Sequence, residues 1–374
     1  ASLIRDVQIF EVNSLAQTAA VLRGKVPLEA FHGAPLNTES DESEIPDFSE
    51  VKGQFLPKRA LEIAAAGKHN ILMYGPPGSG KSMLSKRLPG ILPPLTLEEF
   101  IEVVRIYSSA GQCQNAARLD VRRPFRAPHH TASPIALIGG GTYPKPGEVT
   151  LAHKGVLFLD EFPEFPRAVL EVLRQPLEDR QVTVSRASHQ VTFPADFLLI
   201  AAMNPCPCGW LGDARKSCQC SPFRVQNYRS RISGPLLDRI DLHVEVPAVS
   251  IRAIRRLPPA EPSRAIKCRV LEGYKIQDER FGTSMIRNGT MEPRNIRKHC
   301  AIPDEIADEL ASKIEKLGYS ARVHDKILKI ARTIADLAGS ANIQKEHIME
   351  ALTYRKLDRQ PDFQNLQEGV RPPN

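Results

Sequence analysis

Residues 69–82 read His-Asn-Ile-Leu-Met-Tyr-Gly-Pro-Pro-Gly-Ser-Gly-Lys-Ser, and this stretch decides the fold. Its apolar first part, residues 69–74, predicts a short buried strand, and a glycine-rich turn follows directly. Residues 81–88 then predict a helix, which Pro89 and Gly90 stop. This order of strand, glycine-rich loop and helix is typical of an α/β protein with a phosphate-binding site.

The loop fits the pattern G-x-x-x-x-G-K-[ST], in which backbone N–H groups close around phosphate and the helix N-terminus favours its negative charge. The residues expected to line the nucleotide are Gly75, Pro76, Pro77, Gly78, Ser79, Gly80, Lys81 and Ser82. We expect Lys81 to reach the β- and γ-phosphates and Ser82 to ligate Mg²⁺. The alternative, a glycine-rich turn with a chance lysine, does not explain why the motif lies between a strand and a helix.

A second apolar strand, residues 156–159, ends in the carboxylates of Asp160 and Glu161. We expect Asp160 to hold Mg²⁺ through water and Glu161 to polarise the water that attacks the γ-phosphate. Taken alone, the hexapeptide also fits a strand capped by two solvated acids. Its occurrence beside a phosphate-binding loop favours the catalytic interpretation.

Residues 197–202 and 242–246 add two further buried-type strands, and their spacing predicts a parallel α/β sheet. The first of these strands leads to Asn204, whose amide at the carboxyl end of a parallel strand would face the ligand crevice and orient the same water. An Asn before Pro205 is also a common turn residue, so this assignment depends on the wider match.

The chain divides into five expected parts. Residues 1–50 are an acidic N-terminal segment and linker that looks like the end of something larger, since the initiator Met is missing. Residues 51–247 form the α/β core, and residues 248–262 are a proline-rich linker. Residues 263–358 form a small helical domain, and residues 359–374 are a tail. Apolar residues at three- and four-residue spacing predict helices at 292–300, 304–316, 321–338 and 344–357.

The composition of the chain bears on its partner, through its net charge, and on its cellular compartment. Residues 1–50 carry three basic and nine acidic side chains, a local net charge of −6. Since the whole chain has a net charge of +7, residues 51–374 carry a net charge of +13. Such an excess suits a polyanionic partner, although basic surfaces are often only solvated. No stretch approaches the roughly 18 apolar residues of a membrane span, and no secretion signal is visible. We therefore expect a cytoplasmic protein without a disulfide framework.

Four of the seven cysteines cluster as Cys206-x-Cys208 and Cys218-x-Cys220, which suggests a structural Zn²⁺ site. The one-residue spacing departs from the usual two to four residues, so reduced buried thiols and a redox-sensitive pair remain alternatives. The flank of this cluster is strongly basic and has only Asp213 as a counter-charge. Its cations are Arg215, Lys216, Arg224, Arg229 and Arg231.

With these motifs the chain resembles the magnesium-chelatase-like AAA+ ATPases, and among them the branch-migration helicases of bacterial natural transformation. The resemblance covers residues 51 to about 358. It rests on 52–54, 75–82, 127–131, 139–141, 156–161, 203–209 and 230–241. It implies ATP and Mg²⁺ as ligands, a hexameric ring, and a C-terminal helical lid. Residues 1–50 are similar to the end of the Lon-protease-like domain that precedes the motor in that family.

The resemblance also implies two arginines. Arg239 matches the arginine finger that reaches the γ-phosphate held by a neighbouring subunit, and Arg322 matches the sensor arginine of the helical lid. The alternative is that each is a surface ion-pair former. Arg229 and Arg231 compete for the finger assignment. His129 and His130 belong to the family's sequence signature, but the sequence gives them no mechanism.

Two loops are expected to face a polymer in the pore of the ring. Residues 181–193 alternate as a hairpin whose turn holds Arg186 and His189, and related rings point this hairpin into the pore. Residues 138–148 resemble an insert in the second helix of these motors, with Lys145 at its tip. Positive tips track phosphates without reading bases, but ordinary solvated turns remain equally compatible with each loop alone.

Three functions follow as hypotheses. The first is a hexameric DNA motor that extends heteroduplex by branch migration, for which DNA is the partner. The second is a chelatase-type subunit that remodels a protein for metal insertion into a porphyrin. The third, a protease-associated unfoldase, rests on the N-terminal segment alone. The cysteine cluster, its basic flank and the His-His signature favour the first.

Overall fold

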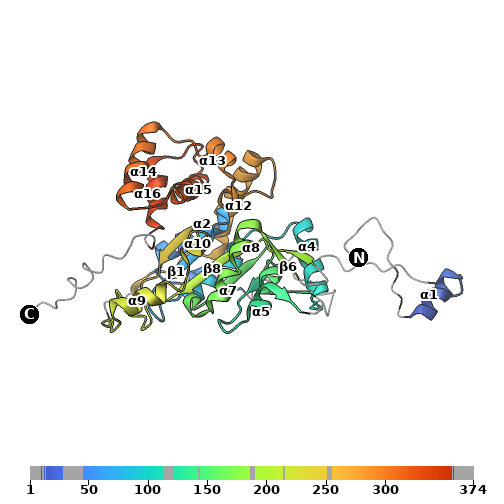
Figure 1. Ribbon diagram of the computed structural model, residues 1–374. Helices are drawn as coiled ribbons and strands as arrows, with labels where there is room; N and C mark the ends of the chain where they lie inside the picture. The colour runs from blue at the N-terminus through green and yellow to red at the C-terminus, as the bar shows by residue number, and fades with distance from the viewer. Residues whose placement is uncertain are drawn as a thin grey trace, which may run out of the picture. The chain divides into compact units, whose positions relative to one another are not determined.

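The computed structural model describes residues 10, 12, 14–27, 45–112, 122–141, 144–185, 190–213, 215–250, 255–355 and 357. These residues fall into two compact units. One comprises Ala1–Asp41 and Leu95–Arg122, and the other comprises Glu42–Pro94 and Arg123–Asn374. The second unit carries the sheet and the C-terminal helices that hold the candidate site (Figure 1).

The first unit contains two helices with side-chain caps. In α1, Leu15–Leu22, the Ser14 hydroxyl accepts a hydrogen bond from the Gln17 backbone. In α4, Leu97–Ser109, Thr96 and Glu99 form a reciprocal capping box, which satisfies backbone N–H groups that the first helical turn leaves free. A small apolar cluster of Leu95, Phe100 and Val103 accompanies α4.

The second unit is built on a five-stranded sheet in the order β2-β5-β8-β1-β9, and every pair in it is parallel. Its strands are β1 Ile71–Tyr74, β2 Phe125–Arg126, β5 Val156–Leu159, β8 Leu198–Met203 and β9 Leu242–Glu245. The predicted parallel α/β sheet is confirmed. Because all strands run the same way, their carboxyl ends lie along one edge and their amino ends along the opposite edge.

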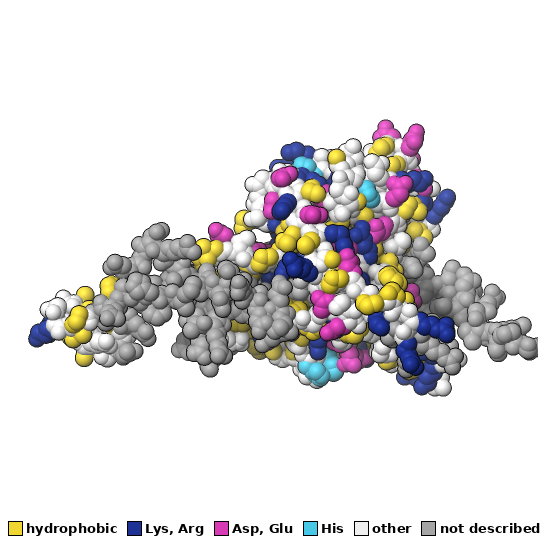
Figure 2. Space-filling view, turned by 180° about the vertical axis from the view of Figure 1, so that it is seen from behind, with side chains coloured by type: hydrophobic (Ala, Val, Ile, Leu, Met, Phe, Trp, Pro, Cys, Tyr) yellow, Lys and Arg dark blue, Asp and Glu magenta, His cyan; other side chains and the backbone are white. Residues whose placement is uncertain are grey.

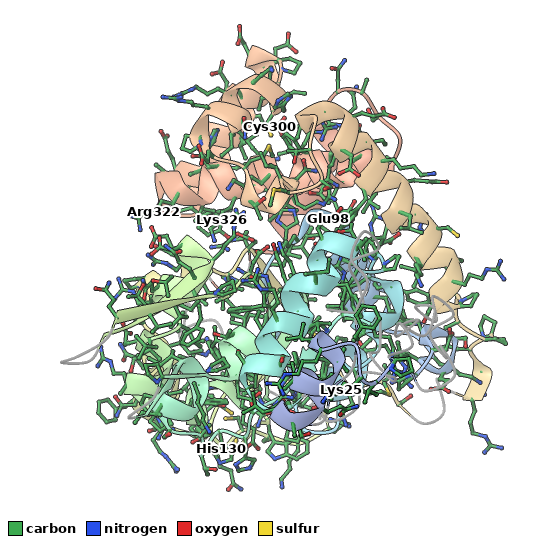
Figure 3. All side chains as sticks on the ribbon, turned by 90° about the vertical axis from the view of Figure 1, so that its right-hand side faces the viewer. Lys25, Glu98, His130, Cys300, Arg322 and Lys326 are labelled. Carbon is green, nitrogen blue, oxygen red and sulfur yellow. The ribbon has the colours of Figure 1, made fainter. Side chains whose placement is uncertain are left out.

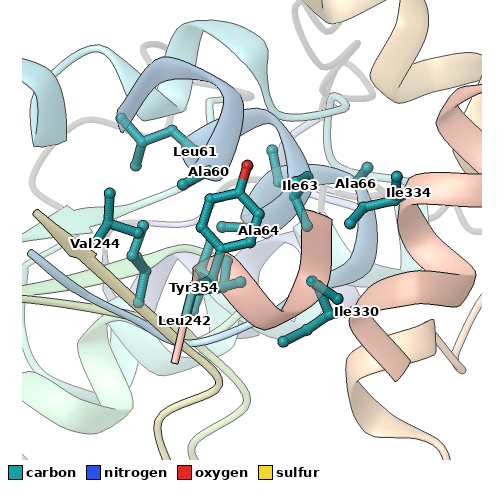
Figure 4. Packing of buried hydrophobic residues seen from close by; sticks show 14 of the residues in the cluster. Ala60, Leu61, Ile63, Ala64, Ala66, Leu242, Val244, Ile330, Ile334 and Tyr354 are labelled. Carbon is teal, nitrogen blue, oxygen red and sulfur yellow. The ribbon is translucent and has the colours of Figure 1, made fainter. Parts of the chain in front are cut away.

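Both faces of the sheet are covered, which is why its strands are continuous apolar runs. Alternate residues enter two separate clusters: Ile71 and Met73 pack on one side of the sheet, and Leu72 packs on the other. On the first side α2, Phe55–Gly67, lies against β9 and the C-terminal helices. Figure 4 shows Ala60, Leu61 and Ala64 of α2 beside Leu242, Val244 and Tyr354.

Shorter elements connect these strands. The helical ones are η2 Phe48–Glu50, α3 Lys81–Ser85, η3 Leu88–Ile91, α5 Pro134–Ile138, α6 Glu148–Leu151, η5 Phe162–Glu164, α7 Arg167–Glu171, α8 Arg174–Asp179, α9 Pro222–Arg229 and α10 Gly234–Leu237. Two hairpins pair β3 Gly139–Gly140 with β4 Lys145–Pro146, and β6 Gln181–Ser185 with β7 Gln190–Pro194. The helix predicted at 81–88 ends as an α-helix at Ser85 and continues as η3, since Pro89 has no N–H to donate to the Ser85 carbonyl four residues earlier.

The C-terminal helices gather on one side of the sheet (Figure 1). They are α12 Ser263–Phe281, η6 Asn288–Thr290, α13 Pro293–His299, α14 Asp304–Lys316, α15 Ala321–Leu337 and α16 Lys345–Thr353. The four helices named from the sequence are present with ends shifted by a few residues, and α12 precedes them. Within the described residues, no helix has the length and apolar character to cross a membrane. The boundaries of the five parts expected from the sequence stay predictions.

Candidate functional site

Three of the predicted catalytic residues, Lys81, Glu161 and Asn204, lie at the carboxyl edge of the sheet. The phosphate-binding loop follows β1, Asp160 and Glu161 follow β5, and Asn204 follows β8. Because β5, β8 and β1 are neighbours in this order, their carboxyl ends converge, as ligand sites of parallel sheets do. Residues far apart in the sequence are thus brought within hydrogen-bonding distance of one another.

Lys81 is buried inside the loop that it belongs to. Its Nζ donates to the carbonyls of Gly75 at 2.7 Å and Pro76 at 3.0 Å, and to Oδ1 of Asn204 at 3.2 Å. Burial lowers the pKa of Lys81, and the Asp160 carboxylate opposes this shift. The three acceptors hold the ammonium group where phosphate oxygens would replace them.

The loop has little space for added atoms. A Cβ on Gly75 would lie 2.1 Å from the Val246 carbonyl, so the chain can pass β9 only as glycine. Gln54 ties the same region together, because its Nε2 donates to the carbonyls of Ser79 and Pro247. The buried Ser79 hydroxyl has no partner among the described residues, which leaves a polar group ready for a phosphate.

The two predicted Mg²⁺ ligands touch each other. Ser82 Oγ donates to Asp160 Oδ2 at 2.5 Å, while Asp160 Oδ1 accepts from the Glu161 backbone at 2.9 Å. A hydroxyl and a carboxylate oxygen are hard donors that suit Mg²⁺. Glu161 itself adopts a left-handed backbone conformation with φ of 51°, and its side chain is about half exposed. The exposed carboxylate is accessible to a water molecule at the carboxyl edge.

His130 contacts the predicted catalytic base. It follows β2, the neighbour of β5, and its Nδ1 lies 2.9 Å from Glu161 Oε2. Its ring packs against His129, with 4.1 Å between the centroids. Sequence analysis assigned no mechanism to His130, because β2, the strand that places it beside β5, is only two residues long.

The two arginines lie at the other edge of the sheet. Arg239 precedes β9; its Nη1 donates to the Pro235 carbonyl at 2.8 Å and its Nη2 pairs with Glu178. Arg322, at the start of α15, is mostly exposed and lies 3.9 Å from Asp238. Both line one cavity of about 720 Å³ together with Asn70, which precedes β1.

Among the described residues, neither arginine contacts the phosphate-binding loop of its own chain. Four-residue strands such as β1 separate the two edges of the sheet by about 10 Å. Figure 3 agrees, because Arg322 and Lys326 lie far from His130, which contacts Glu161 at the carboxyl edge. By contrast, the competing Arg231 donates to Pro163 and Glu164 just beyond β5, and Arg229 donates to Pro205 just beyond β8.

The four clustered cysteines come together. Their sulfur atoms all lie within 4.8 Å of one another, and three pairs are 3.4–3.6 Å apart. A tetrahedral ion with metal–sulfur distances of about 2.3 Å needs sulfurs about 3.8 Å apart, so the set fits a metal ion. Burial opposes ionisation of Cys208, but the Trp210 and Gln219 backbone N–H groups lower its pKa to about 6. The cluster could therefore bind a metal.

The predicted polymer-facing residues are placed only in part. Lys145 is exposed on β4, whereas Arg186 and His189 lie outside the described residues. The basic flank of the cysteine cluster is exposed at Arg215, Lys216 and Arg224. Figure 2 shows Lys and Arg side chains gathered at the end of the molecule that carries α9.

Comparison with known families accounts for most of the chain. The family described as magnesium chelatase, subunit ChlI, matches residues 47–254, and its C-terminal counterpart matches residues 260–355. Competence protein ComM of Haemophilus influenzae is 43% identical over 369 residues, which are 96% of this chain and 70% of that protein. YifB of Salmonella typhimurium is 42% identical over 360 residues, 96% of this chain and 69% of that protein.

A more distant relative is Lon protease 2 of Bacillus subtilis, 28% identical over 191 residues that make up 43% of this chain and 33% of that protein. The family matches cover both the sheet with its phosphate-binding loop and the C-terminal helices. This chain belongs to the magnesium-chelatase ChlI family of AAA+ ATPases and is a member of the ComM type.

Proposed function

We propose that this chain is one subunit of a hexameric, ATP-driven motor that moves DNA and promotes branch migration of incoming DNA during natural transformation. One observation carries the proposal: Arg239 and Arg322 lie at the edge of the sheet opposite to the phosphate-binding loop. In the proposed motor, these arginines act on nucleotide held by another copy. Such a head-to-tail contact forms a ring when its rotation closes.

The carboxyl edge supplies the chemistry of hydrolysis. The loop and Lys81 bind the β- and γ-phosphates, and Ser82 with Asp160 would hold Mg²⁺, which neutralises charge that develops on the phosphate oxygens. Glu161 accepts the proton of the attacking water. Once Lys81 turns to phosphate, the Asn204 amide that it now contacts is free to orient that water.

The amino edge supplies the charge that completes the site of the neighbouring subunit. Arg239 gives up its exposed contact with Glu178, at a cost of at most about 1 kcal/mol, and reaches the γ-phosphate of the adjacent copy. Arg322, already mostly exposed, joins it from the lid. Oligomerisation is thereby part of catalysis.

Support for DNA as the partner comes from sequence similarity to a competence protein and from the positive charge of the chain. The relative with 43% identity is named a competence protein. Residues 51–374 carry a net charge of +13, and exposed cations flank the cysteine cluster. Lys145, Arg186 and His189 would add positive or polar tips that track phosphates without sequence preference.

The deciding experiment measures ATP hydrolysis with and without single-stranded DNA. We expect strong stimulation by DNA that disappears in Glu161→Gln, which retains ATP binding but lacks the base. Hydrolysis that depends on Glu161 but ignores DNA would contradict the DNA-motor proposal. Branch-migration assays on a four-way junction would then be run with the stimulated protein.

A second candidate is a chelatase-type ATPase that remodels a protein partner. The matched family is described by a subunit of magnesium chelatase, which is the observation in its favour. Stimulation of hydrolysis by a protein client, together with indifference to DNA, would select this function.

We also propose Zn²⁺ as the occupant of the four-cysteine cluster. The sulfur–sulfur distances of 3.4–3.6 Å and the all-thiol donor set suit a closed tetrahedral site. The Cys220 backbone N–H donates to Cys218 Sγ at 3.4 Å, a contact that stabilises a bound thiolate. Elemental analysis of the purified protein should find about one zinc per chain, and its absence would refute the site.

A further inference from the structure

The cysteine cluster is in direct contact with the phosphate-binding loop. Gly209, which follows Cys208, is buried with φ of +82° against Pro77. A Cβ on Gly209 would lie 2.6 Å from Pro77 Cδ, so the Gly209 backbone packs against the Pro77 ring as closely as glycine allows. The same Cβ position is 3.8 Å from the Asn204 amide carbon.

Asn204 reaches the cluster through the chain itself. It accepts from Lys81 at 3.2 Å and is separated from Cys206 only by Pro205. The Pro205 carbonyl in turn accepts from Arg229 of α9 at 3.2 Å, and the Cys206 carbonyl accepts from the Gly209 backbone at 2.9 Å. The segment from Asn204 to Trp210 therefore touches Lys81 at one end and Pro77 at the other.

We propose that the metal ion in this cluster is a brace for the nucleotide site, so that nucleotide affinity depends on metal occupancy. The inference rests on the proposed zinc site and is independent of DNA. Cys206 and Cys208 lie within the segment that touches the loop, and Cys218 and Cys220 return from an exposed stretch. An ion bound by all four thiols ties the segment from Asn204 to Trp210 to the stretch that carries Cys218 and Cys220. Without the ion, this segment is held less firmly, and the contact between Gly209 and Pro77 is expected to weaken.

The chain provides its own reporter. Trp210 is the only tryptophan in the sequence and directly follows Gly209. Lys216 Nζ and the Arg215 guanidinium lie 5.1 Å and 5.7 Å from the centre of its ring. Indole emission is sensitive to such cations and to solvent, so metal loss and nucleotide binding are both expected to change it.

Two variants test the brace in different ways. Cys218→Ser with Cys220→Ser removes two ligands that lie outside the segment from Asn204 to Trp210. Gly209→Ala keeps all four thiols but forces Pro77 to move. The matched control is Cys268→Ser, an exposed thiol on α12. For each full-length protein we would measure zinc content, Trp210 emission and the Kd of a fluorescent ATP analogue at fixed Mg²⁺.

We expect the double cysteine variant to lose zinc, shift Trp210 emission and bind the analogue about tenfold more weakly. Gly209→Ala should keep its zinc and still bind about tenfold more weakly, whereas Cys268→Ser should match the parent. A folded, zinc-free protein with the parent Kd would overturn the brace. A parent protein without zinc would instead refute the metal site, and Gly209→Ala would still report whether this segment controls the loop.

Discussion

Arg239→Ala is the substitution that tests whether, as proposed, the ATPase site is divided between two subunits. Arg239 makes no contact with its own phosphate-binding loop among the described residues, and the sheet separates the two by about 10 Å. Its loss should leave nucleotide binding by the same subunit intact. Hydrolysis should fall by about 10³-fold or more, the usual contribution of an arginine that stabilises charge in phosphoryl transfer.

The fold should tolerate this change, since the ion pair with Glu178 is exposed on the Glu178 side and is worth at most about 1 kcal/mol. Glu178→Gln is the matched control: it removes the ion pair and keeps the guanidinium group. We expect Glu178→Gln to hydrolyse ATP at the parent rate or faster, because Arg239 no longer has to leave a partner.

Mixing two inactive variants gives the sharpest readout. Arg239→Ala subunits keep an intact carboxyl edge, and Glu161→Gln subunits keep an intact finger. In rings assembled at random from equal amounts, about one interface in four joins the two intact halves, so about a quarter of parent activity should return. A mixture that is no more active than its components would refute the action of Arg239 on a neighbouring subunit. Full activity of Arg239→Ala alone would instead move the finger to another arginine.

Three further outcomes are expected. His130→Ala should lower kcat about tenfold with little change in KM for ATP, since it removes the contact that positions Glu161; steady-state kinetics would check this, and an unchanged kcat would make the contact incidental. Gly75→Ala should abolish nucleotide binding and lower the free energy of unfolding by about 1–3 kcal/mol, because its Cβ would meet the Val246 carbonyl; analogue titration and urea denaturation would detect both effects. Burial opposes ionisation of Asp241, but Lys326 and His69 hold its pKa far below the usual 3.8. The ionised Asp241 therefore stabilises the fold above pH 3.8, and this stabilisation is lost progressively as the pH falls below 3.8. Urea denaturation should give a lower free energy of unfolding at pH 3 than at pH 5, and the difference should be smaller in Asp241→Asn.

The sequence predicted the strands whose burial is visible in their composition. β1, β5, β8 and β9 are runs of apolar residues because both faces of the sheet are covered. β2 escaped prediction because it is only Phe125 and Arg126, too short for any periodicity. α12 was not named because Gly273 and Gln277 occupy two of its buried positions, which hides the apolar repeat.

The positions of some residues of the candidate site could be predicted from the sequence, and those of others could not. The positions of the loop, the two acids and Asn204 were predictable, since each follows a recognisable strand. The contact of His130 with Glu161 was not, because it depends on β2 lying beside β5. Nor could spacing alone reveal that Gly209 packs on Pro77, which joins the cysteine cluster to the nucleotide site.

β9 links the helical lid to the phosphate-binding loop. At its amino end, the fully buried Arg355 donates to the carbonyls of Ile240 and Asp241, immediately beside Arg239. At its carboxyl end, Val246 donates to Tyr74, and the Pro247 carbonyl accepts from Gln54, which also holds Ser79. A four-residue strand paired along its whole length with β1 is stiff. A shift of the C-terminal helices is therefore expected to reach both Arg239 and the phosphate-binding loop. In the proposed ring these two parts would serve different interfaces and would respond to the same movement.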